Sequence, residues 1–382
     1  MKRLLIITRW YLPATKSGGT VRSIVGLVNG LKDDFKITIL TSNRDLGATE
    51  PYKDIEFDTF LSKNGISIVY LSKLSLFNIY KYMKSAEYDI VYINSFFDIM
   101  TQSIMLLKSF KLIDKRIVLA PRGELANGAL SIKATKKKIY LILYKLFNLS
   151  KNIIFHSTSK EDSVDIQNMF PSNRIELIQN IKERSQESYI LPHKEINNLK
   201  IVFISRIVPV KNLLYGLEIF QKNRIDGTII FDIYGPNEDE NYWHECKKVI
   251  EKLPDNIKVS YKGFVNPDII DKTLSNYHLF FLPTKGENFG HAIVEAMQVG
   301  LIPLISDKTP WTNLESIDVG FSLKLKEPDA FWESIKKVLL FDNSEFLQWS
   351  ENVKKYISKK VNRDKTIEEY RDFFIKLTDK SI

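Results

Sequence analysis

Short runs of hydrophobic residues alternate with helical patterns along almost the whole chain. The first run is Leu4–Ile7, and a helical pattern near Thr20–Leu31 follows it after a loop that contains glycine. Hydrophobic runs of this length are typical of strands that a parallel sheet buries on both faces. The same pattern predicts strands at Lys36–Leu40, Ile66–Leu71, Ile90–Ile93, Arg116–Ala120, Asn152–His156, Ile175–Ile178, Lys200–Ile204, Thr228–Tyr234, Lys258–Lys262, His278–Leu282 and Ile302–Ile305.

The predicted strands fall into two series, and helical patterns separate most of the strands within each series. Residues 182–199 between the two series are mostly polar and lack a strong period, as expected of a linker. Two series of this kind predict two doubly wound α/β domains. We therefore expect domains at 1–185 and 186–360, followed by residues 361–382, in which Arg363–Leu377 has a helical pattern.

The composition is that of an ordinary globular protein, with 44% hydrophobic and 26% charged residues among 382. Cys246 is the sole cysteine, so no intrachain disulfide forms and a reducing compartment is expected. No hydrophobic run reaches the roughly 18 residues of a membrane span. Arg9 ends the first run before it attains the length of a signal sequence. These features predict a cytoplasmic protein.

Positive charge is concentrated in the first part of the chain. The formal net charge is +9, and residues 101–150 contain ten basic and two acidic residues. A basic surface favours an acidic partner, and nucleic acid, an anionic membrane and a phosphorylated acceptor all fit that description. Within this segment, residues 132–151 combine lysines with aromatic and aliphatic residues at helical spacing, which is the pattern of an interfacial helix. A core helix with a solvated basic edge explains the same residues.

Pro283–Met297 carries the strongest candidate chemistry, because it leads from a predicted strand through a glycine-containing loop into a predicted helix. The N-terminus of such a helix offers free backbone N–H groups and a positive dipole end, which suit a phosphate. Gly290 permits close approach of the backbone. Glu287 in the loop and Glu295 in the helix can accept hydrogen bonds from sugar hydroxyls. A capped helix with a solvated glutamate has the same pattern.

Arg206 and Lys211 follow the first strand of the second domain. A guanidinium binds two phosphate oxygens and an ammonium adds a compact charge, so the pair can neutralise a diphosphate. Two cations at a strand end are, taken alone, more often surface residues. Because the carboxyl ends of parallel strands converge on one crevice, these cations, the helix N-terminus and the two glutamates are expected together. That set suits a nucleotide diphosphate that carries a sugar.

These motifs and their spacing resemble glycosyltransferase family 4, the retaining GT-B transferases that use nucleotide sugars. The spacing of Glu287 and Glu295 is the most specific element of the resemblance. Two further segments, Ala120–Leu125 and Thr309–Trp311, are similar to a branch active in the assembly of bacterial surface polysaccharides. The other segments that carry the resemblance are Tyr11–Pro13, Ser17–Gly19, His156–Ser159 and Ser205–Lys211.

The resemblance implies a GT-B fold of two facing Rossmann-like domains, with a C-terminal helix that returns to the first domain. It also implies roles for the matching residues. Arg206 and Lys211 would hold the donor phosphates and Glu287 would contact the donor sugar, so these three are the expected catalytic residues. Glu295 would bind the ribose hydroxyls. The expected donor-binding residues are Gly18, Gly19, Gly235, Phe264, Val265, Asn288, Phe289, Gly290 and Glu295.

The chain departs from the family where many members carry a histidine near the reacting sugar. Arg122 lies in the matching first-domain region, and Tyr92 and Asn94 lie in a second region where histidines are frequent. The sequence therefore does not identify the catalytic group of the first domain. The residues with possible acceptor or sugar contacts are Arg122, His156, His291 and Trp311.

The activity implied is transfer of a sugar from a nucleotide diphosphate sugar to a glycan or lipid-linked acceptor, in capsule, O-antigen or exopolysaccharide synthesis. The sequence has no Asp-x-Asp pair, so we expect no metal and no other cofactor. Binding of residues 132–151 to an anionic surface would place the protein on the inner face of the plasma membrane. The alternatives are a nucleotide-sugar epimerase or phosphorylase of GT-B fold and a basic nucleic-acid-binding protein. Nucleic acid is not expected, since no module that binds it is recognisable.

Overall fold

A computed structural model describes residues 1–131, 134–182 and 189–379 of the chain. The chain divides into two compact units, the first made of residues 1–183 and 363–382 and the second of residues 184–362. Residues 132–133 of the predicted interfacial helix and residues 183–188 of the predicted linker lie outside the described residues.

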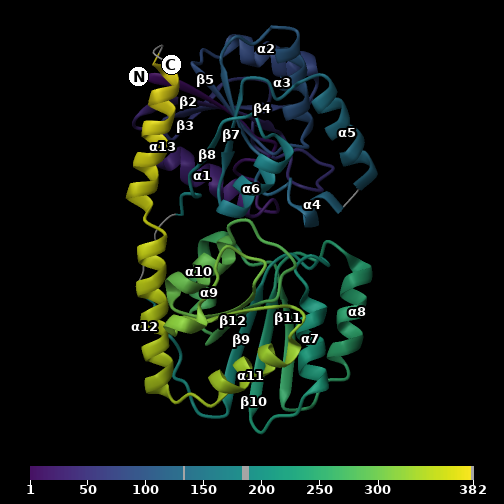
Figure 1. Cartoon of the computed structure of the whole chain (residues 1–382), viewed down its shortest axis with the longest axis vertical. Coiled ribbons are helices and arrows are strands. Elements are labelled where there is room, and N and C mark those ends of the chain that lie inside the picture. Colours follow the sequence, from purple (N-terminus) through teal and green to yellow (C-terminus); the bar gives the residue numbers. More distant parts are fainter. Residues whose placement is uncertain (132–133, 183–188, 380–382) are drawn as a thin grey trace. The chain divides into compact units, whose positions relative to one another are not determined.

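An eight-stranded sheet with the order β3-β4-β2-β1-β5-β6-β7-β8 forms the centre of the first unit (Figure 1). Neighbouring strands are parallel except for β3 and β4 at one edge. The strand order reverses between β1 and β5. The strands are β1 (Lys2–Ile7), β2 (Phe35–Ser42), β3 (Leu61–Lys63), β4 (Ile66–Leu71), β5 (Ile90–Asn94), β6 (Arg116–Ala120), β7 (Ile153–Ser157) and β8 (Ile175–Leu177).

Helices cover both faces of this sheet. Successive side chains of a strand point to opposite faces, so Leu4 and Ile6 of β1 enter one hydrophobic cluster, and Leu5 and Ile7 enter another. Residues of α1 and α13 belong to the first cluster, and residues of α2, α3, α5 and α6 belong to the second. The helices are α1 (Gly19–Leu31), α2 (Leu76–Ser85), α3 (Ile99–Ser109), α4 (Asn127–Ser131), α5 (Ala134–Leu146), α6 (Lys160–Met169) and α13 (Arg363–Thr378).

Helix α13 ends the chain and packs on the first unit. Tyr370 and Phe374 lie in the hydrophobic cluster that contains α1, and the Arg371 guanidinium donates to the Asp34 carboxylate at 2.8 Å. Gly30 of α1 lies so close to α13 that a Cβ there would be 2.8 Å from the Ile367 side chain. The predicted return of the C-terminal helix to the first domain is therefore confirmed.

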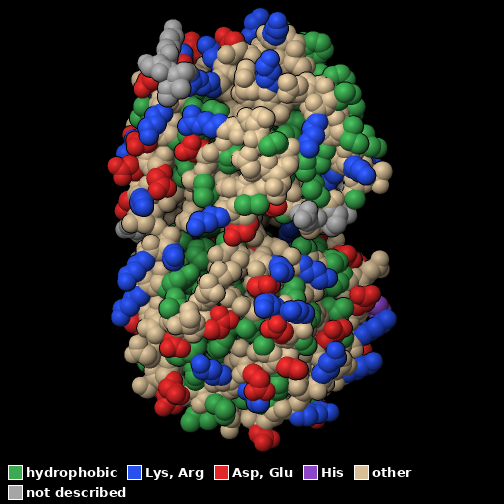
Figure 2. All heavy atoms as spheres, viewed as in Figure 1, with side chains coloured by type: hydrophobic (Ala, Val, Ile, Leu, Met, Phe, Trp, Pro, Cys, Tyr) green, Lys and Arg blue, Asp and Glu red, His purple; other side chains and the backbone are tan. Residues whose placement is uncertain are grey.

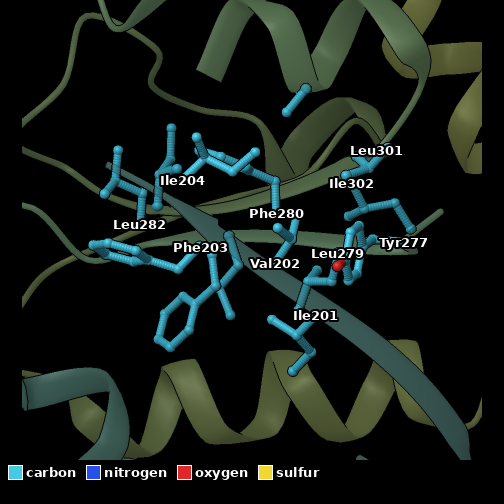
Figure 3. Packing of buried hydrophobic residues seen from close by; sticks show 14 of the residues in the cluster. Ile201, Val202, Phe203, Ile204, Tyr277, Leu279, Phe280, Leu282, Leu301 and Ile302 are labelled. Carbon is cyan, nitrogen blue, oxygen red and sulfur yellow. The ribbon is translucent and has the colours of Figure 1, made fainter. Parts of the chain in front are cut away.

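Six parallel strands with the order β11-β10-β9-β12-β13-β14 form the sheet of the second unit. The order reverses between β9 and β12, which lie side by side in Figure 3 through residues such as Val202 and Phe280. The strands are β9 (Asn198–Ile204), β10 (Thr228–Tyr234), β11 (Ile257–Gly263), β12 (Leu279–Leu282), β13 (Ile302–Ser306) and β14 (Phe321–Leu323). The helices are α7 (Leu213–Lys222), α8 (Glu240–Ile250), α9 (Ile270–Leu274), α10 (His291–Val299), α11 (Pro328–Leu339) and α12 (Asn343–Lys360), with short 3₁₀ turns at Pro267–Ile269 and Glu315–Ile317.

The predicted fold class of two doubly wound α/β domains is confirmed, with two local differences. The three-residue strands β3 and β14 were not predicted. Part of the predicted linker also packs firmly, because Lys194 is buried and its ammonium donates to the Leu339 and Phe341 carbonyls at 2.8 and 3.1 Å.

In the described part of the chain, no helix combines the length and hydrophobicity that crossing a bilayer requires. On the faces of both units visible in Figure 2, basic, acidic and hydrophobic side chains are interspersed.

Candidate functional site

The candidate site of the second unit lies at the carboxyl ends of β9 and β12, where the strand order reverses. Ligands of doubly wound sheets bind at this point, because the loops after the two strands leave in opposite directions. Arg206 and Lys211 lie in the loop after β9, and Glu287 lies in the loop after β12. A hydrogen bond of 2.8 Å from the Lys285 amide to the Val210 carbonyl joins the two loops.

Lys211 and Glu287 form an ion pair across this point, with Nζ and Oε2 2.5 Å apart. Both side chains are mostly buried, with 12% and 20% of their surfaces exposed. The Glu287 amide also donates to the Lys308 carbonyl at 2.9 Å, which fixes the loop. The structure therefore brings together two of the three residues predicted to be catalytic.

Arg206, the third of these residues, forms an ion pair with Glu238 in the loop after β10, with Nη1 and Oε2 3.1 Å apart. Gly235 lets that loop approach the loop after β9. Its φ is 132°, and a Cβ at this position would lie 1.9 Å from the Ser205 carbonyl oxygen, so a larger residue does not fit. The Gly235 amide donates to the Gly263 carbonyl at 2.8 Å, which connects the end of β11 to the same edge.

The residues after β11 and in α10 differ in exposure. Phe264 is half exposed and Val265 is buried. Glu295 lies in α10 and has only 2% of its surface exposed, although glutamate is rarely buried in proteins. A carboxylate held at this depth next to the loop after β12 is suited to binding hydroxyl groups rather than phosphate.

The loop before α10 has a conformation that depends on Gly290. The φ of Gly290 is 76°, and a Cβ there would lie 2.8 Å from the Ile293 side chain. The preceding Asn288 is half-buried and Phe289 is buried. Since α10 begins at His291, the N–H groups of its first turn follow this loop directly.

Trp311 and His291 both lie against Phe289. The Trp311 indole is buried, and its N–H donates to the Phe289 carbonyl at 2.7 Å. The His291 ring lies 4.9 Å from the Phe289 ring in an edge-to-face arrangement. Trp311 is thus a packing residue that holds the loop in this structure, whereas a substrate contact by the half-buried His291 stays a prediction.

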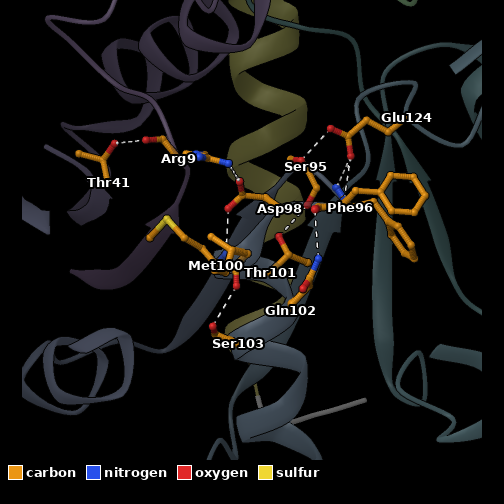
Figure 4. A network of polar contacts seen from close by, with 12 residues as sticks. Arg9, Thr41, Ser95, Phe96, Asp98, Met100, Thr101, Gln102, Ser103 and Glu124 are labelled. Atoms are coloured by element: carbon orange, nitrogen blue, oxygen red, sulfur yellow. Dashed lines mark hydrogen bonds and ion pairs between the residues drawn. The ribbon is translucent and has the colours of Figure 1, made fainter. Parts of the chain in front are cut away.

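The first unit has its own reversal of strand order, between β1 and β5, and charged residues meet there as well (Figure 4). Arg9 follows β1, and its guanidinium lies 3.4 Å from the carboxylate of Asp98, which follows β5. Asp98 also accepts from the Met100 amide at 2.9 Å as the N-cap of α3. Burial raises the pKa of the Asp98 carboxyl group.

Glu124 ties the loop after β6 to the loop after β5. Its carboxylate accepts from the Ser95 hydroxyl at 2.7 Å and from the Phe96 and Phe97 amides at 2.6 and 3.0 Å (Figure 4). Burial raises the pKa of Glu124, and these three donors act in the opposite direction. Glu124 therefore fixes two loops at the carboxyl edge of the sheet.

Arg122 is held by core residues at the same edge. Its Nε donates to Asn94 Oδ1 at 3.0 Å, its Nη2 donates to the Tyr92 hydroxyl at 2.9 Å, and its Nη1 donates to Asn180 Oδ1. Arg122 has a φ of 58°, in the left-handed region that few residues other than glycine adopt. Arg122 is half-buried, and its contact with an acceptor stays a prediction.

His156 was predicted to contact an acceptor or a sugar, and this prediction is wrong for the structure, since the side chain has no exposed surface. Its Nδ1 lies 2.8 Å from the Tyr92 hydroxyl, and its Nε2 lies 2.9 Å from the Ile178 carbonyl oxygen and 3.2 Å from the Tyr370 hydroxyl. His156 is therefore a core residue that links β5, β7 and α13. Burial, reinforced by the charge of Arg122, lowers the pKa of His156 to about 3.

His156 should make the first unit less stable in acid. Between pH 6.5 and about 3 the unfolded chain binds a proton at this residue and the folded chain does not, so stability falls as the pH falls. The loss from this residue between pH 7 and pH 5 is about 2 kcal/mol. In urea unfolding at the two pH values, His156→Gln should lose less stability than the wild type by about this amount. His244→Gln, at an exposed position, is the control, and equal losses in wild type and His156→Gln would contradict the assignment.

Gly18 and Gly19 lie at the start of α1 in the first unit. Gly18 is the N-cap, with a φ of 57°, and Gly19 is the first helical residue. A Cβ on Gly18 would meet no atom within 4 Å, so its conformation and not its neighbours favours glycine. Backbone N–H groups at a helix start suit an anion, and a contact of Gly18 or Gly19 with the donor diphosphate stays a prediction.

Comparison with known families identifies the second unit. Residues 186–356 match the model of the family described as glycosyl transferases group 1. Residues 186–356 belong to this family. The group 1 domain contains Arg206, Lys211, Glu287 and Glu295, which is in agreement with the resemblance seen in the sequence.

Two curated relatives illustrate the similarity. A glycogen synthase of Thermotoga petrophila is 24% identical over 271 residues, which cover 66% of this chain and 51% of the relative. An Escherichia coli UDP-Gal:alpha-D-GlcNAc-diphosphoundecaprenol alpha-1,3-galactosyltransferase is 24% identical over 325 residues, 79% of each chain. The chain thus spans about half the length of the glycogen synthase.

Among solved structures, sucrose-phosphate synthase from Thermosynechococcus elongatus is similar over 99% of both chains, with a TM-score of 0.77 and 14% identity. The chain therefore has the GT-B fold, of which the group 1 domain is the second half.

Glu238 is a residue of the group 1 domain that the sequence pattern did not indicate. Its pairing with Arg206 depends on the approach of two loops that lie 32 residues apart. The turn Gly235–Glu238 after a buried strand was the signal that could have indicated it. The sequence analysis also missed Arg9 and Asp98 in the first unit. Each of them follows a strand, but neither belongs to a recognised motif.

Replacing Glu238 with glutamine should strengthen the binding of a nucleoside diphosphate. If Arg206 binds the phosphates as predicted, the change removes a carboxylate that would compete with them for its guanidinium. An exposed ion pair of this kind corresponds to about two- to fivefold in affinity. Calorimetric titration with UDP and GDP measures the effect, and Glu245→Gln on the exposed face of α8 is the control. Weaker binding in Glu238→Gln would instead mean that Glu238 positions Arg206.

Proposed function

We propose that the protein is a retaining glycosyltransferase that moves a sugar from a nucleotide diphosphate sugar to a glycan or lipid-linked acceptor. The observation that carries the proposal is the meeting of Lys211 and Glu287 at the strand-order reversal of the group 1 domain, beside the loop that holds Arg206. Cations suit the diphosphate of such a donor, and a carboxylate suits its sugar hydroxyls.

The chemistry follows from the charge that develops during transfer. When the bond between the anomeric carbon and the leaving oxygen breaks, negative charge grows on the nucleotide diphosphate. Arg206, Lys211 and the first-turn N–H groups of α10 would stabilise this charge, because they are already fixed before reaction. The donor must displace the carboxylates of Glu238 and Glu287 from the two cations in order to use them.

Retention would arise by attack from the face that the diphosphate leaves. In this proposal the acceptor hydroxyl bonds to the anomeric carbon as the leaving oxygen departs, and the leaving phosphate takes the hydroxyl proton. Glu287 would hold the donor sugar, Glu295 the ribose hydroxyls, and Gly235, Phe264 and Val265 would lie against the base. The two cations would supply the charge that a metal supplies elsewhere, so transfer should persist in a chelator.

The acceptor class is proposed from charge and from one relative. The galactosyltransferase of E. coli acts, by its name, on a diphosphoundecaprenol-linked sugar, and it aligns with 79% of this chain. The basic segment 101–150 suits an anionic surface on which such an acceptor would be presented. We therefore propose synthesis of a surface polysaccharide such as capsule, O-antigen or exopolysaccharide, at the inner face of the plasma membrane.

A hydrolysis screen tests the proposal without knowledge of the acceptor. The purified chain is incubated with a panel of UDP-, GDP- and dTDP-sugars, with and without EDTA, and released nucleoside diphosphate is measured. Slow hydrolysis of one donor that is lost in Lys211→Ala supports a transferase. Conversion of a donor to its epimer would favour an epimerase, and no turnover of any donor together with no binding of any nucleotide would contradict the proposal.

A further inference from the structure

Helix α5 presents a hydrophobic surface to solvent in addition to the one it buries. Ile139, Ile142, Leu143, Leu146 and the adjacent Phe147 are between 45% and 73% exposed. Large hydrophobic side chains are exposed singly on most proteins, but five within nine residues form a patch of the kind that marks an interaction surface. We call these five residues the outer face of α5.

The inner face of α5 already has its packing partners. Tyr144 has no exposed surface, and its hydroxyl contacts the Met105 sulfur of α3 at 3.4 Å. The Tyr140 ring lies 5.7 and 5.6 Å from the rings of Phe96 and Phe97. The sequence pattern predicted one aromatic and aliphatic stripe that includes Tyr140, Leu141, Leu143, Tyr144 and Phe147. In the structure Tyr144 is buried, whereas Leu143 and Phe147 are exposed, so the core interpretation holds for the inner face and the interfacial interpretation stays a prediction for the outer face.

Exposed lysines border the outer face on both sides. At about 100° per residue, Lys138 and Lys145 lie on one flank of the four outer-face residues within α5, and Lys136 lies on the other side, next to Leu143. Lys137 points elsewhere, since its ammonium donates to the Ala129 carbonyl at 2.7 Å. Helix α5 contains no acidic residue. Along the edge where Figure 1 places α5, Figure 2 shows hydrophobic and basic side chains together.

The neighbouring helix α3 has the same character. It contains no acidic residue, and Leu106 and the adjacent Phe110 are 43% and 67% exposed. Lys108 near its end donates to the Lys151 carbonyl, which ties the end of α3 to the segment that follows α5. Hydrophobic exposure and positive charge therefore coincide on two helices that pack together.

We propose that the outer face of α5 docks the protein on an anionic lipid bilayer. The apolar residues would enter the headgroup region while Lys136, Lys138 and Lys145 remain at the level of the lipid phosphates. Charge complementarity selects this occupant, because an apolar stripe with lysines on both flanks and no acidic residue is suited to an anionic surface. The proposal adds the docking face to the proposed function, but binding to lipid does not require transfer activity.

Vesicle co-sedimentation of the full chain tests the proposal. Wild type should bind vesicles of phosphatidylglycerol and phosphatidylcholine at low salt, bind less at high salt, and bind pure phosphatidylcholine weakly. Ile142→Ser should weaken binding by about tenfold through the loss of one inserted side chain. Charge reversal of Lys136, Lys138 and Lys145 to glutamate should weaken it by about 10²-fold or more, since each lysine contributes about fivefold.

Two matched controls test whether vesicle binding depends on the outer face of α5 or only on exposed hydrophobic residues and net charge anywhere in the chain. Ile317→Ser removes an isoleucine of similar exposure, 50% against 56%, which lies between Ser316 and Asp318 in the second unit. Reversal of Lys247, Lys248 and Lys252 on or after α8 changes the net charge by the same amount. Both controls should bind vesicles as the wild type does, and all variants should retain donor hydrolysis if the proposed transferase activity is present.

Three results would overturn the proposal. The first is absence of wild-type binding to anionic vesicles at low salt. The second is an equal loss of binding in the controls and in the α5 variants. The third is a dimer of the free protein that Ile142→Ser dissociates while vesicle binding is unchanged, because the outer face would then belong to a second copy of the chain. Loss of donor hydrolysis alone would count against the transferase function and leave the docking face unaffected.

Discussion

Lys211→Ala and Arg206→Ala should each slow sugar transfer by about 10²–10³-fold, because each removes one of the two cations proposed to stabilise the leaving diphosphate. The effect should fall mainly on the rate constant at saturating donor, since the charge on the phosphates grows as the bond breaks. Removal of the Lys211 side chain should disturb the structure more than removal of the Arg206 side chain. Lys211 has only 12% of its side chain exposed, and its removal leaves the carboxylate of Glu287 without this partner. Steady-state kinetics with the donor found by the hydrolysis screen measure both variants.

Three controls distinguish a direct effect on transfer from unfolding of the variants. Arg224→Ala changes an exposed arginine of the same unit and should have no effect on rate. Lys211→Arg keeps the charge and should retain more activity than Lys211→Ala. Unfolding midpoints of the variants close to that of the wild type would show that the folded state persists. Turnover near the wild-type rate in both alanine variants would remove Arg206 and Lys211 from the transfer step.

The strands inside both sheets could be predicted from the sequence because they are buried on two faces and are therefore hydrophobic at most positions. Ile66–Leu71 and Thr228–Tyr234 match β4 and β10 to the residue. The strands that escaped prediction, Leu61–Lys63 and Phe321–Leu323, lie at sheet edges and have three residues each. An edge strand of this length pairs through its backbone on one side only, so its sequence needs no hydrophobic run.

The candidate site was predicted as a set of residues but not as a set of contacts. The parallel-strand rule brings the ends of β9 and β12 together, and this is sufficient to place Lys211 near Glu287, 76 residues later. The rule does not say that the two side chains pair with each other. It also says nothing of Glu238, because the position of that side chain depends on how closely Gly235 approaches Ser205.

His156 and Trp311 show a second limit of what sequence patterns can predict about a site. His156 and Trp311 both lie in motifs at strand ends, where side chains often reach a ligand, and both are buried in the structure. Each has a polar atom that is satisfied internally, by Tyr92 and Ile178 for His156 and by the Phe289 carbonyl for Trp311. A one-dimensional pattern cannot distinguish a polar group that faces a ligand from one whose partner comes from another element.

Glu295→Gln should weaken the binding of a nucleoside diphosphate, whereas Glu287→Gln should not. Glu287 occupies the Lys211 ammonium at 2.5 Å, so neutralising it frees that cation for phosphate and should leave the affinity for free UDP or GDP unchanged or higher. Glu295 is proposed to accept the ribose hydroxyls from a buried position, and loss of a charged hydrogen-bond acceptor should weaken the same affinity by about 10–10²-fold.

The kinetics of transfer should also distinguish the roles of Glu287 and Glu295. Glu287→Gln should slow transfer by about 10²-fold at saturating donor, because its contact is proposed to be with the sugar that reacts. Glu295→Gln should mainly raise the donor concentration that is needed for half-maximal rate, since a ribose contact is equally strong before and during reaction. Calorimetric titration with the nucleoside diphosphate and donor saturation kinetics give the two readouts, with Glu245→Gln as the control.

If Glu287→Gln loses the nucleotide while Glu295→Gln keeps it, the two roles are exchanged. If both variants lose it equally, the two carboxylates act on one part of the donor, and the separation of ribose and sugar contacts is wrong.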